Sequence, residues 1–239
     1  MSTTAQQPGI TRTDLDSASG KTRPLDTSTL LRWAPIAGIV FVVCMVVGVM
    51  LVGDVPAPNS STGKLATYLT DSHKHTLNII GLYLWVIGAL AFLVFLMRLR
   101  NDLRMAEGGT SPLSHLAFSA GVAFSAVWMV SASAFASVAY AIGLRHAPVT
   151  NTDLVRVLPP LGRLLLLLGG GFSGALLLAA TAAVIFKTRF LPKWLAWLGV
   201  AAAITLLFDV LYHTIWPFWT WVLIACIVML ARRGETATS

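Results

Sequence analysis

Charged residues are scarce in this chain. Asp, Glu, Lys and Arg make up 11% of its 239 residues, and only ten residues are acidic. Soluble domains carry about 25% charged and about 45–50% apolar residues, whereas this chain is 56% hydrophobic and has a mean hydropathy of +0.76. Such a balance excludes a soluble globular protein.

Cysteine is scarcer still, because the chain holds only two. Cys44 and Cys226 both fall in the middle of apolar runs. A thiol in such surroundings behaves as a small packing residue, and two of them build no disulfide framework. We therefore expect no redox role from either.

Long apolar runs, by contrast, fill nearly everything after residue 30. A helix needs about 20 apolar residues to cross a hydrocarbon core about 30 Å thick. Six runs meet this need, and Asp209 is the only charged residue within them: Trp33–Val52, Thr76–Met97, Leu116–Leu144, Leu164–Phe186, Trp194–Tyr212 and Thr214–Ala231. The sequence predicts an all-α polytopic membrane protein, a bundle of six transmembrane helices over residues 31–231. Residues 1–30 form a disordered tail in this prediction, and residues 232–239 a short one.

The positive charges predict the orientation. If both termini are cytoplasmic, twelve Lys and Arg residues lie on the inner side and five on the outer side. Cytoplasmic connections carry the excess of Lys and Arg in membrane proteins, so we expect a multi-pass protein of the plasma membrane with both termini inside. The net charge of +7 is explained in this way, and we expect no nucleic-acid partner.

Small residues at four-residue spacing mark the third and fourth runs. Gly121 and Ser125 form one such pair, and Gly170 and Gly174 form a GxxxG pair. Small residues let helix backbones approach closely in lipid. We expect these two helices at the centre of the bundle, and the alternative is a gating hinge at the glycines 169–171.

Polar residues gather on the predicted outer side. This outer polar cluster consists of Asp71, His73, His75, Asn78, Arg163, Asp209 and His213. Asp209 and His213 are four residues apart, which places them on one face of a helix.

Three interpretations of the cluster remain open. In the first, Asp71 or the next residue caps the second helix, and Asp209 pairs with His213 or Arg163. In the second, imidazole and carboxylate groups bind a transition metal, with His73, His75, Asp209 and His213 as ligands. In the third, Asp209 carries a proton or an ion, because an ionisable residue inside a span is a functional candidate. No cofactor and no catalytic residue is predicted.

The fourth run contains Gly171-Phe172-Ser173-Gly174, and His213 follows downstream. A serine, glycine neighbours and a distant histidine resemble the dyad of the rhomboid intramembrane proteases, in which a base activates the serine. The chain departs from that family, because His213 is followed by Thr-Ile-Trp-Pro and not by the glycine spacing of the family's histidine helix.

A broader resemblance covers most of residues 31–231. The stretches Leu65–Arg104 and Leu191–Gly199 resemble a broad group of uncharacterised six-helix bacterial membrane proteins. Shared features are a short helical first outer loop, an Arg-flanked inner connection and Pro-x-Trp-Leu at the start of the fifth span. The resemblance implies a fold and no catalytic residue.

Three classes of function remain open, and the third is an enzyme, a rhomboid-like intramembrane serine protease. The first is a non-enzymatic accessory protein that binds a membrane partner or a second copy of itself. The second is a transporter of a small molecule, ion or metal that uses the outer polar cluster.

Overall fold

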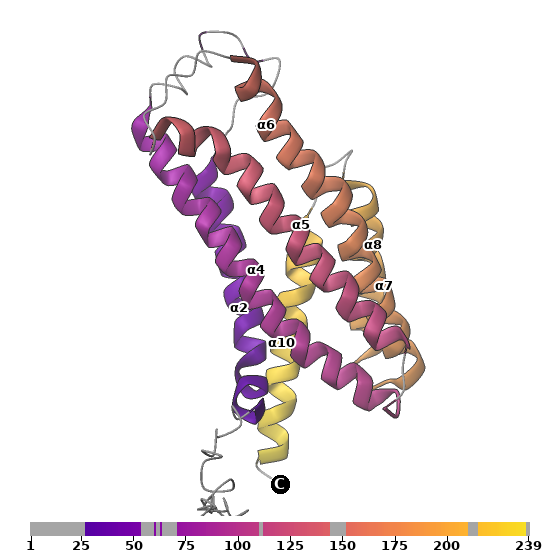
Figure 1. Ribbon diagram of the computed structural model, residues 1–239. Coiled ribbons are helices and arrows are strands. Elements are labelled where there is room, and N and C mark those ends of the chain that lie inside the picture. Colours follow the sequence, from indigo (N-terminus) through magenta and orange to yellow (C-terminus); the bar gives the residue numbers. More distant parts are fainter. Residues whose placement is uncertain are drawn as a thin grey trace, which may run out of the picture.

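The computed structural model describes residues 27–53, 60, 63, 71–109, 112–143, 152–209 and 215–237. These residues are helical apart from short connections, and they contain no strand. The helices are α2 (Thr27–Val52), α4 (Ser72–Ala106), α5 (Pro112–Gly143), α6 (Thr152–Leu165), the π-helical η1 (Leu166–Gly170), α7 (Gly171–Thr188), α8 (Lys193–Leu207) and α10 (Trp216–Ala237). Since α6, η1 and α7 follow one another without a break, these helices form six segments (Figure 1), as the sequence predicts.

Four of the six segments are long and apolar enough to cross a membrane. They are α2, α4, α5 and the α6–η1–α7 segment, whereas α8 and α10 are shorter apolar helices. At a rise of 1.5 Å per residue, α8 is about 22 Å long and α4 about 52 Å. Figure 1 shows α4, α5 and α6 extending beyond α8 and α10 at one end of the bundle.

We name the two ends of the bundle by what they hold. The terminal end contains the start of α2 and the end of α10, and the distal end contains the end of α2 and the starts of α4, α6 and α10. Successive segments pack side by side, and α10 closes the bundle against α2 and α8. α5 lies against α4, α6, η1 and α7.

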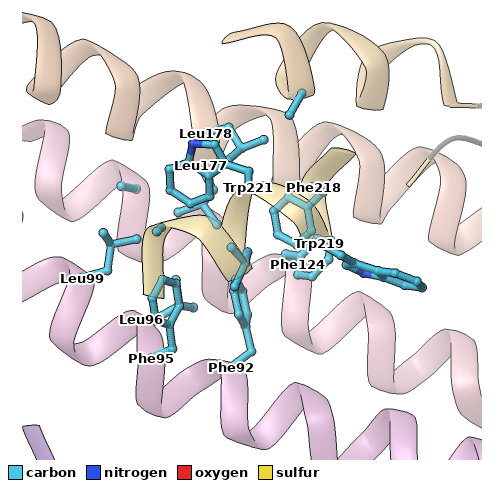
Figure 2. Close-up of a cluster of buried hydrophobic side chains, with 14 of the residues drawn as sticks. Phe92, Phe95, Leu96, Leu99, Phe124, Leu177, Leu178, Phe218, Trp219 and Trp221 are labelled. Carbon is cyan, nitrogen blue, oxygen red and sulfur yellow. The ribbon is translucent and has the colours of Figure 1, made fainter. Parts of the chain in front are cut away.

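The core is a cluster of aromatic rings that joins four segments. Phe92 of α4 lies 4.6 Å from Phe41 of α2, 5.6 Å from Phe124 of α5 and 5.9 Å from Phe218 of α10, between ring centroids. Figure 2 shows Phe92, Phe124 and Phe218 facing one another, with Trp219 at the edge of the cluster. Aromatic pairs at such distances add about 0.5–1.5 kcal/mol each beyond the area that they bury.

Glycines permit the closest helix contacts. A Cβ atom at Gly121 would lie 2.5 Å from Leu96 Cδ1, and one at Gly174 would lie 3.0 Å from Leu206 Cδ1. At Gly171 it would lie 2.9 Å from the backbone oxygen of Leu206. Gly170 differs, because its nearest neighbour, at 3.5 Å, belongs to Leu166 of the same segment. The close approach of α7 to α8 is therefore made by Gly171 and Gly174.

The fourth segment departs from its predicted course. Proline usually ends a helix and the predicted span begins at Leu164, but α6 runs through Pro159 and Pro160 and continues into η1. Transmembrane helices tolerate proline because neighbouring helices satisfy the freed backbone groups or fill the space around them. Here α5 packs closely, since a Cβ at Gly162 would lie 3.0 Å from the Ser131 carbonyl oxygen.

Other boundaries also differ from the apolar runs. α4 continues from Met97 to Ala106, where Arg98 and Asp102 form an ion pair one turn apart. α10 continues to Ala237 and α2 begins at Thr27, both inside the predicted tails. The short helical first outer loop that the resemblance implies falls almost entirely outside the described residues.

Candidate functional site

Asp71 and His73 lie on the surface at the distal end. The Asp71 carboxylate accepts a hydrogen bond from the Lys74 backbone N–H at 3.1 Å, which caps α4, and its second oxygen lies 3.3 Å from Lys74 Nζ. The backbone hydrogen bond, more than the ammonium group, holds the pKa of Asp71 below its ordinary value of 3.8. His73 is exposed on the first turn of α4.

His75 and Asn78 are buried on the inner face of the same helix. Each is 1% exposed, and they lie three residues apart. Asn78 Nδ2 donates a hydrogen bond of 3.4 Å to the backbone oxygen of Val52. This contact connects the start of α4 to the end of α2, so Asn78 has a structural role at the distal end.

Arg163 and Asp209 meet at a cavity near the distal end, which we call the distal cavity. Its volume is about 290 Å³. All six segments or their ends contribute to its wall: Val49, Val52, Gly53, Trp85, Phe135, Arg163, Leu166, Leu167, Asp209, Ile215, Trp216 and Trp219. Asp209, Ile215 and Trp216 in its wall place the cavity where α8 has ended and α10 begins. The helices α4, α5 and α6 extend past the end of α8 (Figure 1).

The two charged residues differ in their exposure. Asp209 is 2% exposed, at the point where α8 ends, whereas Arg163 is exposed on α6. A guanidinium group offers five N–H donors and a carboxylate offers only acceptors when it is ionised. The distal cavity therefore presents both a donor and an acceptor of charge-assisted hydrogen bonds.

Tryptophans form much of the remaining wall. The Trp216 and Trp219 rings lie 5.0 Å apart, and the Trp85 ring lies 5.9 Å from Phe135 and 5.7 Å from Trp128. Among the described residues, the buried indole N–H groups of Trp85, Trp128 and Trp219 find no hydrogen-bond acceptor. A buried donor without an acceptor costs about 1–3 kcal/mol, a cost that the packing of these aromatic rings offsets.

The structure brings together only part of the outer polar cluster. Arg163 and Asp209 line one cavity, while His75 and Asn78 are absent from its wall. His213 lies outside the described residues. Within the described ranges, no three His, Cys, Asp or Glu side chains gather closely enough to hold a metal ion.

Ser173, the serine of the GxSG stretch, makes a local hydrogen bond. Its Oγ donates to the Gly169 carbonyl oxygen at 2.6 Å, and the Gly170 carbonyl oxygen lies at 3.2 Å. The π-helical turn leaves these carbonyls at the junction of η1 and α7. The hydroxyl group thus stabilises the irregular turn.

His115 lies outside the outer polar cluster, and its Nδ1 lies 3.3 Å from Nη2 of Arg100. Sequence reasoning missed the roles of Trp85 and Trp219, which line the distal cavity. Tryptophan is common at membrane interfaces, yet Trp219 is 2% exposed. Phe218, Trp221 and Val222 are also buried, and their spacing places them with Trp219 on one face of α10. Because the whole run is apolar, the sequence does not show that this face turns toward the core.

Comparison with known proteins gives a family and no function. No curated protein and no solved structure matches the chain. The family described as a domain of unknown function (DUF4386) matches residues 36–236. That range includes nearly all of the six helical segments, and the chain belongs to the DUF4386 family.

Proposed function

We propose that this protein is a non-enzymatic, multi-pass protein of the plasma membrane that binds a small molecule in the distal cavity. The observation that carries the proposal is the presence of both Arg163 and Asp209 in the wall of one cavity of about 290 Å³ among apolar helices. Ionisable residues inside membrane-spanning segments are costly, and they commonly mark binding sites or ion paths.

The wall indicates the chemistry of the ligand. Arg163 is a hydrogen-bond donor in the wall, Asp209 is an acceptor when it is ionised, and the rings of Trp85, Trp216 and Trp219 supply aromatic surface. Ligand sites typically combine apolar and aromatic walls with a few polar groups that orient the ligand. We expect a small molecule with a carboxylate or phosphate group and an apolar or amine-bearing remainder.

The proposal extends to topology and partners. The distribution of Lys and Arg favours cytoplasmic termini, which would place the distal cavity toward the outer side. The partners that we propose are the lipid bilayer and either a second copy of the chain or a membrane subunit. We propose no resident cofactor and no nucleic-acid partner.

Transport of the ligand is the second candidate. It is supported by the irregular turn beside the cavity, where the π-helical Leu166–Gly170 follows the proline-containing helix α6. Leu166 and Leu167 belong to this segment and also line the distal cavity. Irregular turns in the helices that line a binding site are common in transporters.

Thermal unfolding in detergent tests the binding proposal. Probes at millimolar concentration would be short-chain carboxylates, amino acids and phosphate monoesters, each with the full-length chain. A ligand at 100 times its Kd stabilises a protein by about 2.7 kcal/mol. We expect at least one probe to raise the Tm of the wild type.

Two variants locate the site. Arg163→Gln should remove the rise in Tm, because it removes the guanidinium donor from the cavity. Lys74→Gln is the matched control, since Lys74 is an exposed cation at the same end that does not line the cavity. Equal responses of the wild type and Arg163→Gln, or no response to any probe, would contradict the proposal.

A further inference from the structure

A second cavity lies at the terminal end, far from Arg163 and Asp209. It has a volume of about 390 Å³ and lies between the end of α4, the α7–α8 connection and α10. Its wall consists of Arg98, Asp102, Met105, Ala106, Phe190, Leu191, Met229 and Arg232. We call it the terminal cavity.

Arg98 is held in place by an ion pair on its own helix. Arg98 Nε donates to Asp102 Oδ2 at 2.8 Å, and the two side chains are 27% and 21% exposed. Residues four apart lie on the same helix face. This bond uses one of the five guanidinium donors and neutralises the carboxylate that would otherwise repel an anion.

Arg232 reaches the same cavity from α10. Its Nη1 donates to the backbone oxygen of Phe190 in the α7–α8 connection. Both arginines are thus oriented by protein acceptors before any ligand binds, which lowers the entropic cost of binding.

The charges around the terminal cavity are mainly positive. Two guanidinium groups and one carboxylate line it. The connection beside it is flanked by Arg189 and Lys193, while Glu107 follows α4 just past Ala106. An anion is therefore the preferred occupant.

Apolar surface adjoins these cations. Met105 is 73% exposed, and Phe190, Leu191 and Met229 contribute the rest of the apolar wall. Trp33, Trp194 and Trp197 are 59%, 52% and 65% exposed at the same end of the bundle. Exposed tryptophans on apolar helices mark the membrane–water interface, so the terminal cavity lies at the depth of lipid headgroups.

We infer that the terminal cavity binds the phosphate of an anionic phospholipid. Arg98 and Arg232 bind the phosphate oxygens, and Met105 and the Phe190–Leu191 connection contact the glycerol and acyl chains. Basic pockets between transmembrane helices are suited to such headgroups. The inference is independent of the ligand of the distal cavity.

Native mass spectrometry of the full-length chain in mild detergent tests this inference. The probes are phosphatidylglycerol, phosphatidylcholine and sn-glycerol 3-phosphate, titrated separately. We expect phosphatidylglycerol to bind more tightly than phosphatidylcholine. Arg232→Gln should weaken its binding about five-fold, and Arg98→Gln combined with Arg232→Gln should weaken it further.

Arg100→Gln is the control, because Arg100 lies on the same helix but contacts His115 and Phe118 outside the terminal cavity. Its affinity for phosphatidylglycerol should equal that of the wild type. If the double variant does not fold, Arg232→Lys replaces it and should retain most of the selectivity for phosphatidylglycerol over phosphatidylcholine. Equal binding of the two lipids, or equal losses in Arg100→Gln and Arg232→Gln, would overturn the inference. If sn-glycerol 3-phosphate binds as tightly as phosphatidylglycerol, the assignment of a lipid is wrong and the ligand is a free phosphate ester.

Discussion

Asp71 connects the stability of the distal end to pH. Its carboxylate caps α4, and the backbone N–H of Lys74 holds its pKa below 3.8. Because the folded-state pKa is depressed, this contribution is complete above the ordinary pKa and is lost as the pH falls through the lower, folded value. We expect Asp71→Ala to lower the Tm slightly at neutral pH, with the difference from the wild type shrinking below pH 3.8.

The control for Asp71 is Asp71→Asn, because Asn caps a helix about as well as Asp and does not titrate. Its Tm at neutral pH should stay close to that of the wild type, and its pH dependence should be weaker. Thermal unfolding of the three proteins between pH 3 and 7 measures this. A difference between wild type and Asp71→Ala that persists unchanged at the lowest pH would contradict the assignment.

Asp209 offers a sharper test of proton coupling. It lines the distal cavity at the end of α8, and Asn has nearly the same shape but cannot exchange a proton. We expect Asp209→Asn to abolish any proton-coupled flux through the protein. The measurement is the internal pH of proteoliposomes that contain a pH-sensitive dye.

Asp71→Asn serves again as the matched control, since Asp71 is a carboxylate at the same end but outside the distal cavity. It should leave the flux unchanged. Flux through Asp209→Asn equal to that of the wild type would exclude Asp209 as the carrier, and the distal cavity would remain only a binding site.

For single residues, the sequence predicts the position along the bundle axis better than whether the side chain turns toward the core or outward. The positions of Arg163 and Asp209 near the ends of apolar runs place them on one side of the bundle, and they do line one cavity. His73 and His75 are two residues apart, yet one is exposed and the other buried. A helix that is apolar all round carries no pattern that shows which face turns inward, so the burial of His75 could not be foreseen.

The crossing of α2 and α4 gives a prediction at the scale of elements. A Cβ at Gly81 would lie 2.8 Å from the backbone oxygen of Gly48, and one at Gly48 would lie 2.4 Å from Trp85. Backbone cannot yield as a flexible side chain does, so Gly81→Ala forces the helices apart. We expect a loss of about 1–3 kcal/mol in stability.

Gly170→Ala is the matched control, because its new methyl group would meet only Leu166, at an ordinary contact distance of 3.5 Å. Thermal or denaturant-induced unfolding of both variants measures the difference. Equal stabilities would show that the α2–α4 crossing adjusts freely, contrary to the packing described.

The existence of the helices is predictable, but their boundaries are not. Hydropathy finds the six segments because the bilayer requires apolar residues over a fixed length. Beyond the apolar runs, helices continue wherever polar groups stabilise them, as Arg98 and Asp102 do for α4. Pro159 and Pro160 predict a helix end that does not occur, since α6 packs against α5 and stays helical through both residues.

The unequal lengths of the segments shape the whole molecule. α8 and α10 are too short to line the full height that α4, α5 and α6 occupy (Figure 1), and the distal cavity lies at the step. The apolar runs at Trp194–Tyr212 and Thr214–Ala231 gave no sign of this step, because their lengths resemble that of Trp33–Val52. One molecule thus presents an Arg–Asp cavity at one end and an arginine-rich cavity at the other.

The orientation of the chain in the membrane decides which of the two cavities faces the cytoplasm. Cysteine labelling measures this orientation. Among Lys and Arg, twelve of the seventeen belong to the predicted cytoplasmic side, so we expect the terminal end inside. His73→Cys and Lys187→Cys replace exposed residues at the distal and terminal ends. Cys44→Ala removes the half-buried native thiol, while Cys226 can stay because it is fully buried.

A membrane-impermeant maleimide should label His73→Cys in intact cells and Lys187→Cys only after permeabilisation. Lys187→Cys removes one positive charge, but Lys and Arg remain in excess at the terminal end. The substitution should therefore not reverse the orientation of the chain in the membrane. The reverse pattern of labelling would place the terminal cavity, with Arg98 and Arg232, in the outer leaflet. In that case the distal cavity would open to the cytoplasm, and its ligand would be a cytoplasmic molecule.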